Sequence, residues 1–232
     1  MNIVYTIVIS MLINVVVYSF QVPVRYSAYN KIRPVFFNIY KDREDIFSLK
    51  QFNREYSLEH VIPRSLFKYE TLIKKDMHNI ILYPNKVNTH RSNYKYISDF
   101  KIYGNSMLLD EFGNRIDYKS PITEDTIMIK TNTKKLFYPC KKYRGLIARS
   151  AMYFLITYPK YQSEILENVI DPYTILTWHH QNPVNKFELS KNQFIKEIQG
   201  NDNIFVLNES LLIPEMEKIL NEDLSIFNKN IK

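Results

Sequence analysis

The sequence is poor in glycine and nearly free of cysteine, and both shortages exclude common kinds of site. Among its 232 residues there are four glycines, Gly104, Gly113, Gly145 and Gly200. They lie too far apart to build the Gly-rich loop of a dinucleotide-binding turn or a P-loop. The single cysteine, Cys140, excludes a disulfide within the chain and a cysteine-rich zinc site.

Acidic side chains are outnumbered by basic ones. Lys and Arg total 31 and Asp and Glu total 24, which gives a formal net charge of +7. Hydrophobic residues make up 45% of the chain and aromatic residues 14%, so the chain can build a folded core and extensive disorder is excluded. A basic globular chain of this length is expected to form one domain and to bind a polyanion.

Charge is also absent from the N-terminus, where residues 3–20 carry no charged side chain. An apolar run shorter than a full membrane span, with a small residue such as Ser19 at its end, is typical of a signal peptide. We expect residues 1–19 to be cleaved before Phe20 and residues 20–232 to form a secreted or extracytoplasmic domain. A retained membrane anchor and a buried strand are the alternatives.

Apolar runs and turn signals predict an α+β fold in a single helix-rich domain. Short strands are expected at residues 99–105 and 126–130. Helices are expected at residues 145–159, 161–168, 172–181 and 184–199, and again in the C-terminal stretch from residue 207. Gly200 is expected to end the helix that precedes it.

Most of the candidate catalytic and metal-binding residues lie between residues 57 and 97. Strands are expected over residues 58–62 and 79–83, followed by a helix that begins at Pro84. One face of this helix carries three polar residues, Asn88, Arg91 and Ser92. Two strands and a helix with polar groups aimed inward would form a cradle for one cation.

The polar residues of this segment suit hydrolysis of a phosphodiester. Mg²⁺ prefers carboxylate and amide oxygens together with water, and Glu59 and Asn88 could supply them. A neutral imidazole on His60 could take the proton from an attacking water. Because adjacent side chains on a regular strand point to opposite faces, we expect either irregular backbone at residues 58–60 or a cation bound over the strand edge.

Several stretches, in matching order, resemble the endonuclease I family of nucleases, which are built on a ββα-metal (His-Me) finger. The finger, at about residues 57–97, carries the patterns Glu-His-Val-x-Pro-x-Ser at 59–65, Asp-x-His-Asn at 76–79 and Asn-x-x-Arg-Ser-Asn at 88–93. Residues 144–149 and 178–205 resemble two further blocks of that family. Asn182, Lys191 and Ile204 depart from the family pattern of Asp, Arg and Pro, and all three lie outside the finger.

The resemblance implies a Mg²⁺-dependent, largely sequence-nonspecific endonuclease that leaves 5′-phosphate ends on DNA, RNA or both. Mn²⁺ or Ca²⁺ are the expected substitutes for Mg²⁺. Roles are implied for His60 as general base, Glu59 and Asn88 as metal ligands, Arg91 as the arginine near the site, and His78 and Asn79 as the pair that orients the finger. We expect a monomer without a small-molecule cofactor.

Residues 130–145 contain six basic residues and no acid, interleaved with aromatic rings. Such a stretch would neutralise phosphates and give binding that weakens steeply with salt. The residues expected to contact the nucleic-acid backbone are Arg64, Lys134, Lys135, Lys141, Lys142 and Arg144. The alternative is an ordinary solvated loop.

Two other kinds of protein stay open as alternatives. One is a catalytically inactive, basic protein that binds or packages nucleic acid with a nuclease fold, although such a protein has no need for Glu59, His60 and Asn88 together. The other is an HNH-type enzyme with a structural Zn²⁺, which a single cysteine disfavours.

Overall fold

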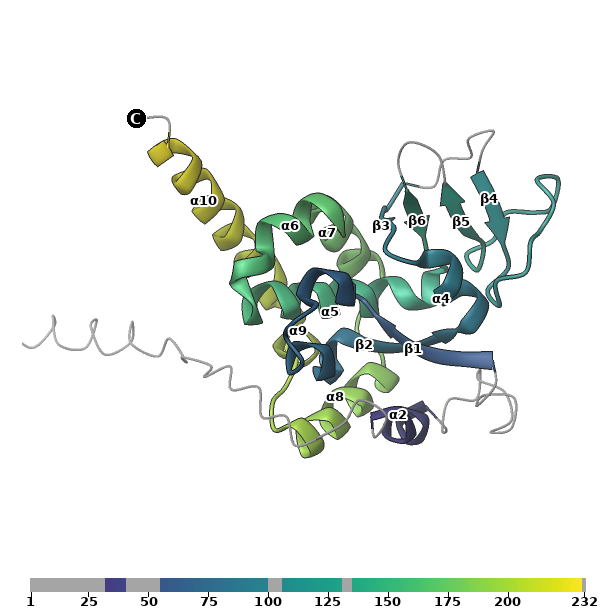
Figure 1. Ribbon diagram of the computed structural model, residues 1–232, viewed down its shortest axis with the longest axis horizontal. Helices are drawn as coiled ribbons and strands as arrows, with labels where there is room; N and C mark the ends of the chain where they lie inside the picture. The colour runs from purple at the N-terminus through teal and green to yellow at the C-terminus, as the bar shows by residue number, and fades with distance from the viewer. Residues whose placement is uncertain (1–31, 41–54, 100–105, 131–134, 231–232) are drawn as a thin grey trace, which may run out of the picture.

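The computed structural model describes residues 32–40, 55–99, 106–130 and 135–230 (Figure 1). The signal-peptide prediction for residues 1–19 and the position of Lys134 lie outside the described residues. In chain order the elements are α2 (Ile32–Tyr40), β1 (Tyr56–His60), η2 (Arg64–Phe67), η3 (Ile73–Lys75), η4 (Met77–Asn79), β2 (Ile80–Pro84), α4 (Asn85–Arg91), β3 (Lys95–Tyr96), β4 (Ser106–Leu109), β5 (Ile127–Lys130), β6 (Leu136–Tyr138), α5 (Lys141–Thr157), η5 (Pro159–Tyr161), α6 (Gln162–Asn168), α7 (Pro172–Gln181), α8 (Lys186–Gln199), α9 (Ile204–Leu207), η6 (Glu209–Leu211) and α10 (Leu212–Asn230).

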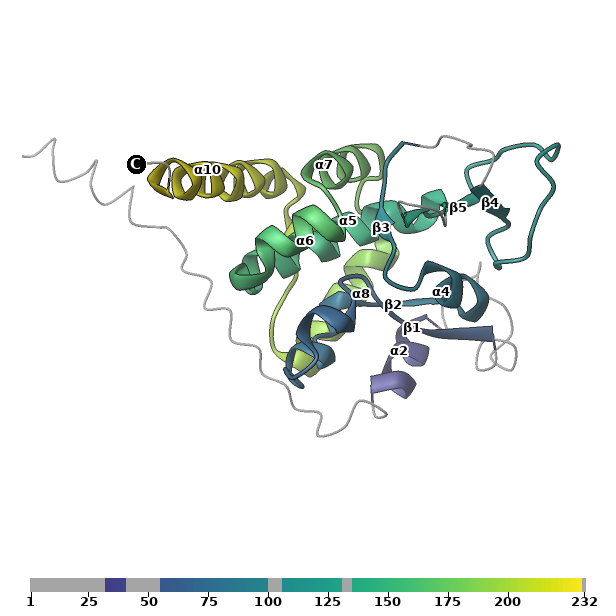
Figure 2. The same ribbon diagram turned by 45° about the horizontal axis from the view of Figure 1, so that its top comes forward.

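Within the described residues, two small sheets accompany the helices, which confirms a mixed α+β fold in a single domain. Strands β1 and β2 pair antiparallel, with Glu59 opposite Ile81 and His60 opposite Ile80. The second sheet has the order β3-β6-β5-β4, in which β3 runs parallel to β6 and the other pairs are antiparallel. This sheet lies at one end of the molecule, whereas α10 extends from the opposite end, away from β1 and β2, as Figure 1 and Figure 2 both show.

Helix α5 lies at the centre of the core, as its apolar sequence predicts. Every residue from Tyr143 to Leu155 is buried, so the helix is covered on all sides. It packs against α7, α9, α10 and η4. The helix begins at Lys141 rather than at the predicted residue 145. The prediction followed the apolar pattern, which does not include the lysines of the first turn.

Two glycines are required by the backbone around them. A Cβ at Gly145 of α5 would lie 2.6 Å from the carbonyl oxygen of Asn182, so only glycine allows the chain after α7 to approach α5 this closely. Gly200 ends α8 with a φ of 91°, which glycine adopts without strain. The predicted end of this helix is therefore confirmed.

Strand β2 lies between two hydrophobic clusters. Its side chains alternate: Ile81 and Tyr83 belong to the large core around α5, whereas Ile80 and Leu82 pack in a second cluster with α2. A strand buried on both faces has little freedom to slip, because a shift of one residue would exchange the two faces. The strand β1 that pairs with it is fixed by the same packing.

The predicted helices at 161–168 and 172–181 correspond closely to α6 and α7, and the C-terminal helix is α10. The finger differs in detail: β1 ends at His60, and Pro84 is the last residue of β2 rather than the first of α4. Ser92 follows α4 with a φ of 52°, so it lies outside the helix, but it lines the same pocket as Asn88. No helix within the described ranges is long and apolar enough to span a bilayer.

Candidate active site

The turn that follows β1 is held by side chains and by a backbone hydrogen bond from the Val61 N–H to the Asn79 carbonyl (2.9 Å). The side-chain amide of Asn79 accepts a hydrogen bond from the Ile62 N–H (2.8 Å) and donates one to the Ile62 carbonyl (3.1 Å). The guanidinium of Arg91 donates to the carbonyls of His60 (3.2 Å) and Val61 (2.7 Å). The backbone at and after His60 is therefore positioned by η4 and by the end of α4.

Beside this turn is an open pocket of about 390 Å³, whose lining includes Glu59, His60, Arg64, Asn88 and Arg91. The pairing of β1 with β2 is continuous up to His60, so the prediction of irregular backbone at residues 58–60 is wrong. The alternative, a cation bound over the strand edge, stays a prediction. Both of the last two side chains of β1 reach the pocket because the strand ends there.

The ring of His60 is held by a backbone carbonyl. Its Nε2 lies 2.9 Å from the carbonyl oxygen of Lys74, and since a carbonyl can only accept, Nε2 carries the ring proton and Nδ1 the lone pair. Burial lowers the pKa of His60 to about 4; the hydrogen bond to Lys74 raises it, and the charges of Arg64 and Arg91 lower it further. The imidazole is therefore neutral near pH 7, the state that can accept a proton.

Glu59 is buried beside Arg91, whose Nη1 lies 2.7 Å from Glu59 Oε1. This contact does not have hydrogen-bond geometry, so within the described part of the chain Oε1 has no hydrogen-bond partner. Burial raises the pKa of Glu59 to about 7, although the guanidinium of Arg91 lowers it. The carboxylate of Glu59 is therefore held beside a guanidinium, and its oxygens are of the kind that could coordinate a hard cation.

The amide of Asn88 is oriented by β1. Its Nδ2 donates to Ser57 Oγ (2.9 Å) and to the carbonyl of Leu58 (3.4 Å). The amide oxygen is therefore the atom of this side chain that could coordinate a cation, from the same pocket that Glu59 lines.

The donor set fits a hard cation that keeps water ligands. In the described ranges, no group of three or more His, Cys, Asp or Glu side chains comes together to hold a metal. Glu59 and Asn88 would supply two oxygens, which suits Mg²⁺ with several bound waters. The set does not suit a structural Zn²⁺, which takes four ligands, mostly sulfur and nitrogen.

Arg91 is near the site, as the resemblance implies, but it is buried. Its side chain is 1% exposed, and its guanidinium lies 4.5 Å from the centre of the Tyr96 ring. The hydrogen bonds it donates go to the backbone at His60, Val61 and Ser92. These contacts hold the chain that carries His60.

His78 connects the finger to the helical core. Its ring contacts that of Tyr153, with centroids 4.6 Å apart, and its Nε2 lies 3.0 Å from the carbonyl of Asn201. Burial lowers the pKa of His78 to about 4, although the charge of Asp76 raises it. His78 and Asn79 thus contact the core and the turn after β1 respectively, and their role in orienting the finger stays a prediction.

Asp76 has a structural importance that the sequence interpretation missed. Its fully buried carboxylate accepts four hydrogen bonds, from Tyr158 Oη (2.7 Å), Tyr153 Oη (3.0 Å), the Gln199 amide (2.9 Å) and the His78 N–H (3.0 Å). The residue is the N-cap of η4. The signal in the sequence is the Asp-x-His-Asn pattern at residues 76–79, because aspartate is a common N-cap just before a helical turn.

Several of the predicted phosphate contacts are paired within the protein. Lys141 and Lys142 bond to Glu124 and Glu111. Arg144 is buried, donates to the carbonyl of Pro139 (3.0 Å), and lies over the Tyr138 ring. Arg64 is exposed and lines the pocket, and the exposed Lys135 lies 5.9 Å from the ring centre of Tyr94. Arg64 and Lys135 are thus the most accessible of the predicted contacts that the structure describes.

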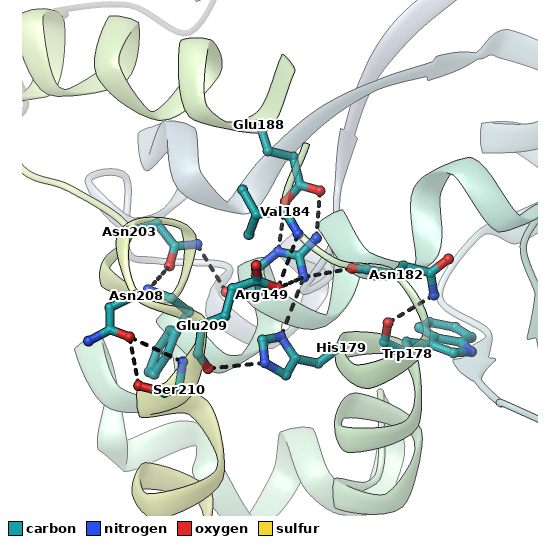
Figure 3. Close-up of polar contacts among 11 residues, drawn as sticks. Arg149, Trp178, His179, Asn182, Val184, Glu188, Asn203, Asn208, Glu209 and Ser210 are labelled. Atoms are coloured by element: carbon teal, nitrogen blue, oxygen red, sulfur yellow. Dashed lines mark hydrogen bonds and ion pairs between the residues drawn. The ribbon is translucent and has the colours of Figure 1, made fainter. Parts of the chain in front are cut away.

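The blocks at residues 144–149 and 178–205 meet around Arg149, as Figure 3 shows. Its guanidinium makes two hydrogen bonds with the carboxylate of Glu188 (2.5 and 2.7 Å) and one with the carbonyl of Asn182 (2.9 Å). His179 Nδ1 lies 3.4 Å from the same guanidinium. This buried network joins α5, α7 and α8, so the two blocks determine packing.

The departures from the family pattern fit this packing. Asn182 contacts Arg149 through its backbone carbonyl, which an aspartate would also offer. Lys191 is buried within 5.9 Å of the ring centre of Phe36, and burial lowers its pKa to about 8. Ile204 is buried at the start of α9.

A comparison with protein families agrees with this geometry. The family model described as Endonuclease I matches residues 14–210, which is most of the chain and includes every residue of the pocket.

Proposed function

The chain belongs to the endonuclease I family and is therefore an endonuclease, a hydrolase of phosphodiester bonds in nucleic acid; we propose that His60 is its general base and that Glu59 and Asn88 hold one Mg²⁺. Family membership implies dependence on a metal in general. The choice of Mg²⁺, with Mn²⁺ or Ca²⁺ as substitutes, rests on the two oxygen ligands. The observation that carries the proposal is that Glu59, His60 and Asn88 line one pocket.

In this proposal, His60 takes a proton from the attacking water, and neighbouring residues hold His60 in position. The Lys74 carbonyl fixes the proton on Nε2 of His60, so Nδ1 is the atom that takes the proton from water. Arg91 holds the backbone carbonyl of His60, and Asn79 holds the backbone of Ile62, two residues further on. When bound, Mg²⁺ would act as a Lewis acid on the phosphate and the departing 3′-oxygen. Departure of the 3′-oxygen leaves a 5′-phosphate end.

The substrate is proposed to be bound through its backbone, with little sequence preference. The described residues offer no evident module for reading base edges, so contacts would be mainly to phosphates. Export by a signal peptide at residues 1–19 belongs to the same proposal. N-terminal sequencing of secreted protein should begin at Phe20; secreted protein that begins at Met1 would contradict it.

The decisive experiment compares the intact protein with His60→Ala on plasmid DNA and on RNA, with Mg²⁺ and with EDTA. We expect the variant to cut about 10²–10⁴-fold more slowly and EDTA to stop cutting by both proteins. The matched control is His180→Ala, because His180 is exposed on α7 and should leave the rate unchanged. Equal cutting by the intact protein and His60→Ala would remove His60 as the base.

A further inference from the structure

The segment between the two finger strands, residues 64–75, is attached to the pocket at both ends, and we name it the spacer arm. Arg64 and Ser65 line the pocket. Near the other end, the Lys74 carbonyl bonds to His60 and its ammonium group bonds to the Lys68 carbonyl. The arm therefore begins at the pocket and returns to the ring of His60, so its solvent-facing side chains lie within a few residues of the pocket lining.

The arm is anchored rather than loose. Phe67 is buried, with its ring centre 5.5 Å from that of Phe154 and 6.2 Å from that of Tyr161. Glu70 accepts hydrogen bonds from Lys160 (2.6 Å) and from the Tyr161 hydroxyl. The backbone between these two anchors is held in place, which reduces the entropy lost when a side chain that it carries binds a ligand.

Tyr69 is the side chain that this anchored arm exposes. It is 94% exposed, more than any other large hydrophobic side chain of the described residues. A single exposed ring needs no explanation by itself. The arm, however, also has four basic residues and only one acid, and that acid is Glu70, whose carboxylate is bound by Lys160.

We propose that Tyr69 stacks on an unpaired base of the nucleic acid held in the pocket, so that the enzyme favours single-stranded or locally unpaired segments. This inference rests on the proposed function and refines its substrate class. An aromatic ring beside a positively charged track is how proteins bind single strands without reading sequence. A base stacked within a duplex offers neither of its faces to such a ring.

The distances along the chain allow this contact. Tyr69 follows Ser65 by four residues, which span at most about 14 Å even when fully extended. At about 3.4 Å of rise per nucleotide along one strand, the base that meets Tyr69 lies within about four nucleotides of the phosphate in the pocket.

The test compares the binding of two nucleic-acid strands by four full-length proteins. EDTA is present so that the strands are not cut. One strand is a single-stranded oligonucleotide of about 12 nucleotides, and the other is an abasic strand with the same number of phosphates. The proteins are the intact chain, Tyr69→Ala, Tyr69→Phe and Tyr173→Ala, and their Kd values are measured by fluorescence anisotropy. Tyr173 is the matched control because it is 72% exposed on α7.

We expect Tyr69→Ala to raise the Kd for the normal strand about 5- to 150-fold, which corresponds to the loss of one stacked base. Its binding of the abasic strand should stay within about twofold of the intact protein. Tyr69→Phe keeps the ring and should restore binding, and Tyr173→Ala should bind both strands like the intact protein.

Two results would overturn the proposal: equal binding of the normal strand by Tyr69→Ala and the intact protein, or the same loss on both strands. Failure of the proposed function would show elsewhere, as unchanged cutting by His60→Ala. The two failures are therefore distinguishable.

Discussion

The side-chain amide of Asn79 hydrogen-bonds to both backbone groups of Ile62: it accepts from the N–H and donates to the carbonyl. This contact adds to the backbone hydrogen bond from the Val61 N–H to the Asn79 carbonyl (2.9 Å), just beyond the end of β1. It joins the start of the finger to η4, across a segment that includes the spacer arm.

Replacing the amide with a carboxylate should therefore break half of the contact. In Asn79→Asp, one oxygen can still accept from the Ile62 N–H, but the other faces the Ile62 carbonyl with no proton to donate. We expect the free energy of unfolding to fall by about 1–3 kcal/mol and kcat to fall by up to about 100-fold, which is what a displacement of about 1 Å can cost. Urea unfolding and steady-state cleavage measure the two effects. The control Asn168→Asp, at an exposed position, should change neither, and an unaltered kcat in Asn79→Asp would contradict the positioning role.

Metal binding can be tested apart from activity. Mg²⁺ that binds the folded chain should raise its unfolding free energy by about 2.7 kcal/mol at a concentration 100 times its Kd. Glu59→Gln removes the charged ligand, so the same Mg²⁺ concentration should raise stability much less. Thermal unfolding with Mg²⁺ and with EDTA gives this increment for each protein. Glu167→Gln, at an exposed glutamate, is the matched control; an increment in Glu59→Gln equal to that of the intact protein would exclude Glu59 as a ligand.

The buried His78 predicts a loss of stability in mild acid. Burial lowers its pKa from 6.5 to about 4, so below pH 6.5 the unfolded chain gains a proton that the folded chain does not accept. The unfolding free energy should therefore fall as the pH falls from 6.5 to about 4, by up to about 3 kcal/mol for this residue. His78→Asn cannot titrate, so its stability should depend less on pH in this range. His180→Asn should keep the slope of the intact protein, and equal slopes for all three proteins would refute the assignment.

Replacing only one partner of the ion pair between Arg149 and Glu188 should lower the free energy of unfolding more than replacing both partners. Arg149→Met leaves the Glu188 carboxylate buried without its partner, which should cost about 3–5 kcal/mol. Adding Glu188→Leu removes that charge and should recover much of the loss. Urea unfolding measures both, with Arg115→Met as an exposed control expected within about 0.5 kcal/mol of the intact protein. A double variant no more stable than Arg149→Met would show that the cost is one of packing.

The elements that depend on nearby residues could be predicted from the sequence. Helix α7 begins at Pro172 and α8 ends at Gly200, because these residues have local backbone preferences that act wherever they occur. The order of the motifs around Glu59, His60 and Asn88 likewise identified the family and the residues of the pocket.

Only the tertiary structure decided which charges meet. In the sequence, Lys141 and Lys142 belong to a run without acids, yet the fold brings Glu124 and Glu111 to them. Arg91 was expected near the site, but its burial against Tyr96 could not be predicted. The tautomer of His60 depends in the same way on a carbonyl that η3 carries to it. Pairings between residues far apart in the chain follow from how the elements pack, and no local preference encodes them.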